Sequence, residues 1–322
     1  MLLASYAVAY FAPATGQWLR GVSLNGGVTG SLSLSRVLLA ALLALAGMGI
    51  DWTKLRESLE HPATLFTALA VKLIAPAVVV FLIAAALKGG PQPETAQLLL
   101  GLALIAAMPA AGSSPAWTQA AGGDVAVSVG LLVGSTVLGP LCGSLWLDGF
   151  AAAAGGDQLP DRLRVAVSGL SFLAWVIVPT AVGMALRHYL GTKVIARWKP
   201  YLRLAGAALL LLLIYVFASE AISRAMQRSA PSELASAVSL AALLCCSGFL
   251  FGWLTGRLSH SGHSSRVACV YGVGMHNNGI ALLVADAVLP SDSAAFAPII
   301  AYALVQHLLA GAVDALLAWR RG

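Results

Sequence analysis

Apolar residues run through the chain in long blocks that short polar or charged segments separate. We count ten blocks, and their ranges are 2–17, 34–51, 62–88, 95–119, 124–147, 163–187, 201–224, 233–256, 265–287 and 294–318. Most are long enough for a helix that crosses a hydrocarbon core, which takes about 20 residues. A transmembrane barrel would alternate apolar and polar positions instead. The pattern therefore predicts an all-α polytopic membrane protein with ten transmembrane helices.

Composition supports this class and excludes others. Of the residues, 59% are hydrophobic and 10% are charged, too few charges to cover the surface of a soluble domain of 322 residues. The net charge of +6 comes from basic residues scattered through loops, so no nucleic-acid partner is predicted. The cysteines fit no metal-ligand spacing and are expected to be small buried hydrophobes; they are Cys142, Cys245, Cys246 and Cys269.

The loops predict how the chain sits in the membrane. Ten spans place both termini on one side, and the loops of that side carry eleven basic residues against seven opposite. Basic residues favour the cytoplasmic side, so both termini are predicted to be cytoplasmic, in a bacterial-type inner membrane. The first block is the weakest, because "FAPATGQW" interrupts it. Without a basic start it resembles a first span more than a cleaved signal.

The polar linker 151–162, "AAAAGGDQLPDR", divides the ten blocks into five and five. We therefore predict two repeats, residues 1–150 and 151–322. An odd number of spans in each repeat inverts the second relative to the first, which is a recurring architecture of secondary transporters. The fourth block of each repeat is the one that breaks, at "MPAAGSSPAWTQ" (108–119) and at "GVGMHNNG" (272–279).

Paired breaks at matching positions of inverted repeats predict a binding site near the bilayer midplane. Non-helical backbone at that depth needs a protein or water-filled cavity around it, and broken helix ends offer N–H groups to anions and carbonyls to cations. The alternative is two kinked helices that pack through small residues, with Ser and Asn bonding between helices. The candidate residues at the breaks are Ser113, Ser114, Gly272, Val273, Met275, His276, Asn277 and Asn278.

Lys72 is the strongest single candidate for a functional residue. It lies about ten residues from either end of its apolar block, where a charge costs ~2.5–3.5 kcal/mol on insertion scales. Such a lysine indicates a functional site, and the alternative is a lysine that reaches the headgroups or lies neutral against a carbonyl. His276 either titrates near neutral pH or is a neutral histidine bonded to a carbonyl.

The other ionisable residues of the spans carry weaker expectations. His307 and Asp314 lie two helical turns apart on the last block and form either a polar seam or ordinary packing. Asp51, Asp124 and Asp286 fall at span ends, and we expect solvated helix caps. The sequence contains no GxSxG, HExxH or P-loop motif, so we predict no enzyme, and a transporter here would be a secondary one.

The broken segments and their flanks resemble the bile acid:sodium symporter family. The resemblance rests on "MPAAGSSPAWTQAAGGDVAVSVGLLVGST" and "GVGMHNNGIALLVA", with support from "GMGIDWTKLRESLEHPA" and "QHLLAG"; residues 150–260 match in hydropathy alone. It implies a panel domain of spans 1, 2, 6 and 7 and a core domain of spans 3–5 and 8–10, with spans 4 and 9 crossing at their breaks. It also implies import of organic anions with two sodium ions bound at the crossing.

Several positions depart from the family pattern. A glycine, Gly272, replaces the sodium-binding glutamate, and the other replacements are Lys72 and His276 for glutamines, Pro115 for asparagine and Leu132 for threonine. Ser114 and Ser128 are kept. Sodium is a hard cation that takes oxygen ligands, so losing a carboxylate and gaining an ammonium disfavours two sodium sites.

We therefore predict a transporter of small organic anions in which the Lys72 ammonium occupies the place of one sodium ion. Coupling would then be absent or carried by protons on Lys72 or His276. One alternative is a sodium symporter that uses the carbonyls of Val273 and Met275 with Ser114 and Ser128. Another is a receptor that keeps the fold without transport. The expected partners are the organic anion and the lipid bilayer; no cofactor is expected, and sodium is disfavoured.

Overall fold

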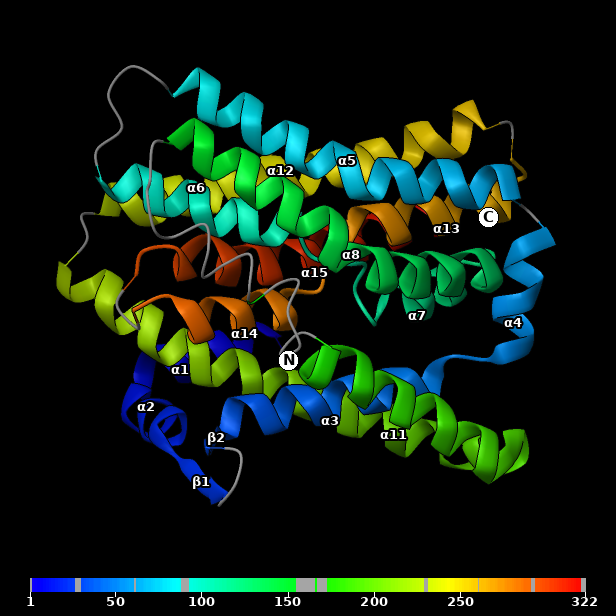
Figure 1. Cartoon of the computed structure of the whole chain (residues 1–322), viewed down its shortest axis with the longest axis horizontal. Helices are drawn as coiled ribbons and strands as arrows, with labels where there is room; N and C mark the ends of the chain where they lie inside the picture. Colours follow the sequence, from blue (N-terminus) through cyan, green and yellow to red (C-terminus); the bar gives the residue numbers. More distant parts are fainter. Residues whose placement is uncertain are drawn as a thin grey trace.

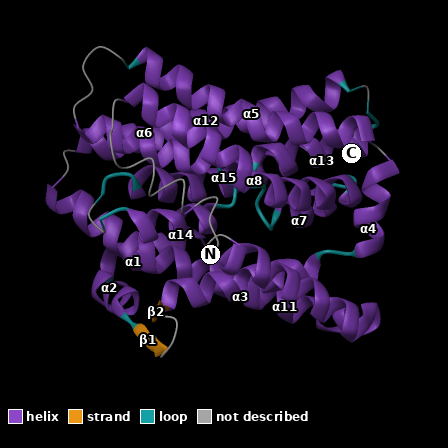
Figure 2. Cartoon of the chain, in the orientation of Figure 1, coloured by secondary structure: helices purple, strands orange, loops and turns teal. Residues whose placement is uncertain are grey.

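The computed structural model describes residues 2–26, 30–60, 62–87, 93–154, 166, 173–228, 231–259, 261–290 and 293–319. These residues are helical apart from loops and one short β-hairpin (Figure 2). The helical class is therefore confirmed, while the hairpin was not predicted. Its strands, β1 (Ser23–Gly26) and β2 (Gly30–Ser33), pair antiparallel with Ser23 opposite Ser33.

The helices of the first half follow the predicted blocks. They are α1 (Leu2–Phe11), α2 (Pro13–Gly21), α3 (Leu34–Gly49), α4 (Trp52–Glu57), η1 (Ser58–Glu60), α5 (Pro62–Ala86), α6 (Pro93–Ala106), α7 (Ser114–Ala120) and α8 (Val125–Ala154). The expected interruption of the first block falls at Ala12, because Pro13 begins a new helix. The predicted linker 151–162 is helical as far as Ala154, and its remainder lies outside the described residues.

The second half begins with a short π-helical turn. Its elements are η2 (Leu173–Ile177), α11 (Val178–Arg228), α12 (Pro231–Leu258), α13 (His263–Gly274), α14 (Asn278–Val288) and α15 (Phe296–Trp319). The loop expected over residues 188–200 is wrong, because helix continues through it and only Gly191 departs from helical backbone, with φ 77°. Gly191 has no Cβ to clash at positive φ, so two helices meet there.

Four helices are long and apolar enough to cross a membrane by themselves: α5, α8, α12 and α15. Counting α3 with α4–η1, and Trp175–Leu202 with Leu204–Ser219, as bent spans raises the number to six among the described residues. Large apolar side chains on α5 and α8 are exposed, among them Phe66, Leu82, Leu141 and Leu145. Such an apolar exterior suits a lipid surrounding.

The helices lie in two layers (Figure 1). One layer, which we call the α3/α11 layer, holds α1, α2, α3 and α11. The other, which we call the crossing layer, holds α5 to α8 and α12 to α15. Its interior contains the largest fully buried side chains, Tyr271 and Tyr302, packed with Leu102 and Leu104.

Glycines bring backbones together inside each layer. A Cβ on Gly47 would lie 2.2 Å from the Thr180 oxygen, and one on Gly183 would lie 2.0 Å from the Ala44 oxygen, so α3 and α11 touch through their main chains. In the crossing layer, a Cβ on Gly252 would lie 2.5 Å from the Cys269 oxygen. Between the layers, a Cβ on Gly112 would lie 3.1 Å from the Ala46 Cβ, and one on Gly279 would lie 2.9 Å from Leu39 Cδ1.

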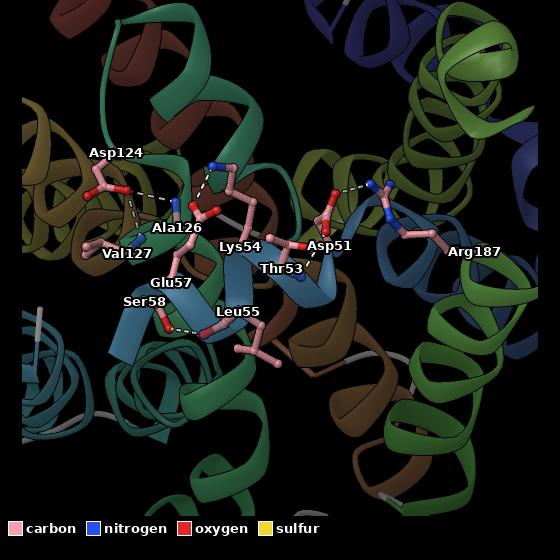
Figure 3. A network of polar contacts seen from close by, with 10 residues as sticks. All are labelled: Asp51, Thr53, Lys54, Leu55, Glu57, Ser58, Asp124, Ala126, Val127 and Arg187. Atoms are coloured by element: carbon pink, nitrogen blue, oxygen red, sulfur yellow. Dashed lines mark hydrogen bonds and ion pairs between the residues drawn. The ribbon is translucent and has the colours of Figure 1, made fainter. Parts of the chain in front are cut away.

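The connector α4–η1 joins the two layers (Figure 3). It leaves the direction of α3 at 71°. Asp51 caps α4 by accepting from the Thr53 N–H, 2.9 Å, and pairs with Arg187 of α11 at 2.6 Å. Asp124 similarly caps α8 by accepting from the N–H groups of Ala126 and Val127. These two aspartates confirm the predicted caps, and Asp51 adds an ion pair.

Candidate functional site

Two helices are interrupted inside the crossing layer. The first break separates α6 from α7, at Ala107 to Ser113, and the second separates α13 from α14, at Met275 to Asn277. Pro109 lacks an N–H and cannot continue α6. Met275 is extended, with φ −101° and ψ 131°, and Asn277 caps α14 by accepting from the Ile280 N–H. Both breaks were predicted from the sequence.

The breaks cross and bond to each other through their main chains. Ala111 N–H donates to the Met275 oxygen at 3.1 Å, and Asn277 N–H donates to the Pro109 oxygen at 2.9 Å. Ala110 and His276 therefore face each other as an isolated antiparallel bridge. This short bridge satisfies backbone groups that the missing helical turns leave open.

Two buried side chains satisfy the remaining N–H groups of the bridge. Ser135 Oγ on α8 accepts from Ala110 N–H at 2.9 Å, and Gln306 Oε1 on α15 accepts from His276 N–H at 2.7 Å. Each side chain comes from the long helix that follows the broken helix pair in its half of the chain. Sequence reasoning missed both, although each is a polar residue within an apolar span, which is the signal that would have found them.

Lys72 of α5 points into the second break. Its Nζ donates to the Met275 oxygen at 2.9 Å and to the Val273 oxygen at 3.3 Å, and the residue is 1% exposed. These carbonyls belong to the C-terminal end of α13, where unpaired oxygens and the helix dipole favour a cation. The break frees the Val273 oxygen, because His276 N–H and Asn277 N–H bond elsewhere. A lysine that reaches the headgroups is excluded by this burial.

His276 lies beside Lys72 in a network around Tyr302. The Tyr302 hydroxyl lies 2.8 Å from His276 Nδ1 and 3.2 Å from the Gly274 oxygen. Since the hydroxyl has one proton, donation to Gly274 makes Nδ1 the donor of the imidazole and leaves Nε2 as an acceptor. His276 is fully buried, and Nε2 has no partner within the described part of the chain.

Hydroxyl groups gather at the start of α7. Thr118 Oγ1 donates to Ser128 Oγ of α8 at 3.2 Å. Ser114 lies one turn before Thr118, so these two hydroxyls share one side of α7. All three residues are fully buried. Ser113 is the N-cap residue of α7 and makes no side-chain cap bond. Thr118 was missed by the sequence reasoning.

Three buried polar atoms around the crossing have no partner among the described residues. They are Ser114 Oγ, His276 Nε2 and Asn278 Oδ1. A buried polar atom without a bond costs about 1–3 kcal/mol, so such a group indicates a place for water, an ion or a bound molecule. Among the predicted site residues, Lys72 contacts Val273 and Met275 directly, and Ser114, His276 and Asn278 carry the unpartnered atoms.

Gly272 lies against α8. A Cβ at this position would be 2.5 Å from Leu131 Cδ1, so Leu131 fills the space that a larger residue at 272 would need. The neighbouring Leu132 is also buried. The predicted positions thus offer hydroxyls, carbonyls, amides, an imidazole and an ammonium at the crossing, and no carboxylate. In the described part of the chain, no group of three His, Cys, Asp or Glu side chains is placed to hold a metal.

The remaining candidates lie away from the crossing. His307 bonds the oxygen of Ala303 on its own helix, at 2.8 Å, which favours packing over a polar seam with Asp314. Asp286 is not a solvated cap, because it pairs with Arg20. Cys246 is exposed, against expectation, because its neighbour Cys245 occupies the buried side of α12; Cys142 is half-buried, and Cys269 is buried.

A known protein family matches this chain. The family model of the sodium bile acid symporter family matches residues 36–228, which is more than half of the chain. The match contains Lys72, the first break and Ser135, and it ends before the second break. No curated protein matches the chain. The chain belongs to the sodium bile acid symporter family.

Proposed function

We propose that the protein is a secondary transporter of small organic anions in which the Lys72 ammonium stands in the place of one co-transported sodium ion. The observation that carries this proposal is the pair of bonds from Lys72 Nζ to the oxygens of Val273 and Met275. The family is a sodium symporter family, which supports transport and gives no indication of an enzyme. The substrate class and the coupling are our inference.

An ammonium meets the same requirements as sodium at this place. Both carry one positive charge, and both satisfy carbonyl oxygens that the broken helix leaves open. The ammonium differs in being tethered to α5, so it cannot leave with the substrate. The crossing is then held together at all times without an ion, and substrate movement does not draw on a sodium gradient at this position.

A sodium ion fits the remaining atoms poorly. Sodium takes several oxygen ligands and gains most from a carboxylate, yet position 272 is glycine and Leu131 occupies the space beside it. The hydroxyls of Ser114, Thr118 and Ser128 remain as oxygen donors. The unpartnered Ser114 Oγ favours a second candidate function, a symporter that binds one sodium ion at these hydroxyls.

Anion binding is supported by the atoms that face the crossing without partners. The N-terminus of α14 offers a positive dipole end, and Asn278 lies in its first turn. His276 Nε2 and Ser114 Oγ add polar atoms nearby, and Lys72 adds positive charge. A small carboxylate placed there would satisfy several of these groups together.

We infer the wider organisation from the resemblance to the sodium bile acid symporter family. The chain has ten spans in two inverted repeats, 1–150 and 151–322, in a bacterial inner membrane with both termini in the cytoplasm. The α3/α11 layer then serves as the panel domain and the crossing layer as the core domain. Alternating access comes from movement of one layer against the other.

Uptake into proteoliposomes tests the proposal. Taurocholate and a set of short monocarboxylates serve as labelled probes, with an imposed sodium gradient, an imposed proton gradient or neither. We expect uptake or counterflow by wild type that does not need sodium, lost in Lys72→Gln and kept in the surface control Lys54→Gln. Uptake that requires the sodium gradient in wild type would refute the proposal. Probe binding without counterflow would favour the receptor alternative.

A further inference from the structure

A second cluster of charged and aromatic side chains lies away from the crossing, where α14 ends and α15 begins. Arg20 of α2 donates from Nη2 to Oδ1 of Asp286 on α14, at 2.7 Å. The same guanidinium lies 5.3 Å from the ring centroid of Phe217 and 5.1 Å from that of Phe296. The two rings stack with centroids 6.3 Å apart. One arginine thus contacts an acid and two aromatic faces.

The cluster joins the two layers. Arg20 and Phe217 belong to the α3/α11 layer, and Asp286 and Phe296 belong to the crossing layer. Within the described residues, one other side-chain hydrogen bond links the layers, from the Tyr6 hydroxyl to the Ile300 oxygen at 2.7 Å. It lies at the same end of the molecule, near the start of α15. The polar links between layers are therefore concentrated at one end.

The opposite end is built differently. In Figure 1, α2 and the end of α14 lie on the left, and the connector α4 lies on the right. There Arg187 pairs with Asp51 at 2.6 Å, but both residues belong to the α3/α11 layer or its junction with α4. At this end an apolar cluster that contains Ile50, Met184 and Leu132 joins the layers.

The environment of Arg20 strengthens its bonds. The side chains of Arg20 and Asp286 are 11% and 20% exposed, and both phenyl rings are buried. An ion pair and a cation–π contact that are shielded from water are screened less by salt than exposed ones. If the layers separated at this end, Arg20 would lose its ion pair with Asp286 and its contact with the Phe296 ring together.

We propose that Arg20, Asp286, Phe217 and Phe296 form a gate that closes this end of the transport path. The inference rests on the proposed function only in that the layers must part for a substrate to pass. When they part, Phe217 stays with Arg20, while Asp286 and Phe296 move away with the crossing layer. The freed guanidinium then faces the opening and favours organic anions over cations there.

A buried reporter cysteine tests the gate without any substrate. Leu213 is 1% exposed and lies between the layers, with its Cδ2 3.5 Å from the place of a Cβ on Gly279. In a full-length background with Cys142, Cys245, Cys246 and Cys269 replaced by alanine, Leu213→Cys reports opening at the gate. Met184→Cys reports the opposite end. The reaction with a polar maleimide is timed on purified protein in detergent.

The expected result is a selective change. Asp286→Asn should raise the labelling rate of Leu213→Cys about tenfold, which corresponds to ~1.4 kcal/mol, without raising that of Met184→Cys. Arg20→Gln should do the same. The matched control is Asp51→Asn, which removes the Arg187–Asp51 pair and should leave the labelling of Leu213→Cys unchanged.

Two results would overturn the gate. One is unchanged labelling of Leu213→Cys in both gate variants while they elute as folded protein. The other is an equal increase at both reporters, which would indicate general loosening. Because the labelling needs no substrate and no ion gradient, a failed uptake experiment would leave this result standing, and the reverse also holds.

Discussion

Replacing Lys72 by glutamine removes the ammonium and leaves an amide oxygen in its place. The Met275 oxygen keeps its bond from Ala111 N–H, but the Val273 oxygen loses its bond from the ammonium. A hydrogen bond to a charged group contributes ~1.5–3 kcal/mol, and the longer of the two bonds contributes less, so we expect a loss of about 2–4 kcal/mol. The expected outcome in sodium-free buffer is a lower melting temperature than that of wild type.

Sodium should recover part of this loss in the variant. The amide oxygen of the introduced glutamine and the oxygens of Val273 and Met275 would form an oxygen site where the ammonium was. For a Kd of about 10 mM, sodium at about 100 mM stabilises by ~1.4 kcal/mol. The assay is thermal unfolding of purified protein in detergent across sodium concentrations, with potassium at equal ionic strength. Lys72→Met is the matched control, because its side chain offers no oxygen ligand.

Either of two results would refute the reasoning. If sodium stabilises wild type as steeply as Lys72→Gln, the ammonium does not occupy the ion's place. If Lys72→Gln and Lys72→Met respond alike to sodium and potassium, the two carbonyls are not an ion site. A shallow sodium response of both wild type and Lys72→Met would point to the hydroxyls of Ser114, Thr118 and Ser128.

Three further predictions concern the neighbourhood of the crossing and the connector. Gln306→Leu leaves His276 N–H without an acceptor and should lower stability by about 1–3 kcal/mol, measured by thermal unfolding; a melting temperature equal to wild type would contradict the role of Gln306. Gly272→Ala should destabilise because its Cβ meets Leu131 Cδ1, and Leu131→Ala should relieve the loss in the double variant; additive losses would count against this contact. Burial alone would raise the pKa of Asp51, but hydrogen bonds from Thr53 and the charge of Arg187 lower it below 3.8 overall. A depressed pKa means that the pair contributes stability above about pH 4 and loses it as pH falls further, so Asp51→Asn should flatten the acid side of a stability–pH curve.

Much of the architecture follows from hydropathy and from helix-breaking residues. The long apolar runs predicted α5, α8, α12 and α15, and Pro109 with the Gly–Met–His–Asn–Asn run predicted both breaks. Local chemistry favours these breaks, because a proline removes one helical N–H donor, although α5 and α8 continue through Pro76 and Pro140. The helix through residues 192–202 was not predicted, because its basic residues interrupt the apolar pattern and were interpreted as a loop.

The partners of the site were harder to predict because they come from distant parts of the chain. Lys72 was identified from the cost of a charge in an apolar span, but its bonds to Val273 and Met275 join residues about 200 positions apart. Ser135, Tyr302 and Gln306 are polar residues of largely apolar helices, and the packing of α8 and α15 against the breaks brings them to the crossing. The pairing of Arg20 with Asp286 likewise needs the fold.

The close approach of main chains inside each layer has a mechanical consequence. Gly47, Gly183 and Gly252 let neighbouring helices lie backbone against backbone, so each layer behaves as a stiff plate that cannot shear internally without collision. Between the plates, Gly112 and Gly279 meet only side-chain atoms, which can slide past one another. Replacing glycine by alanine thus has two different effects in this protein. Within a layer it prevents two helices from packing closely, and between the layers it hinders their movement past each other.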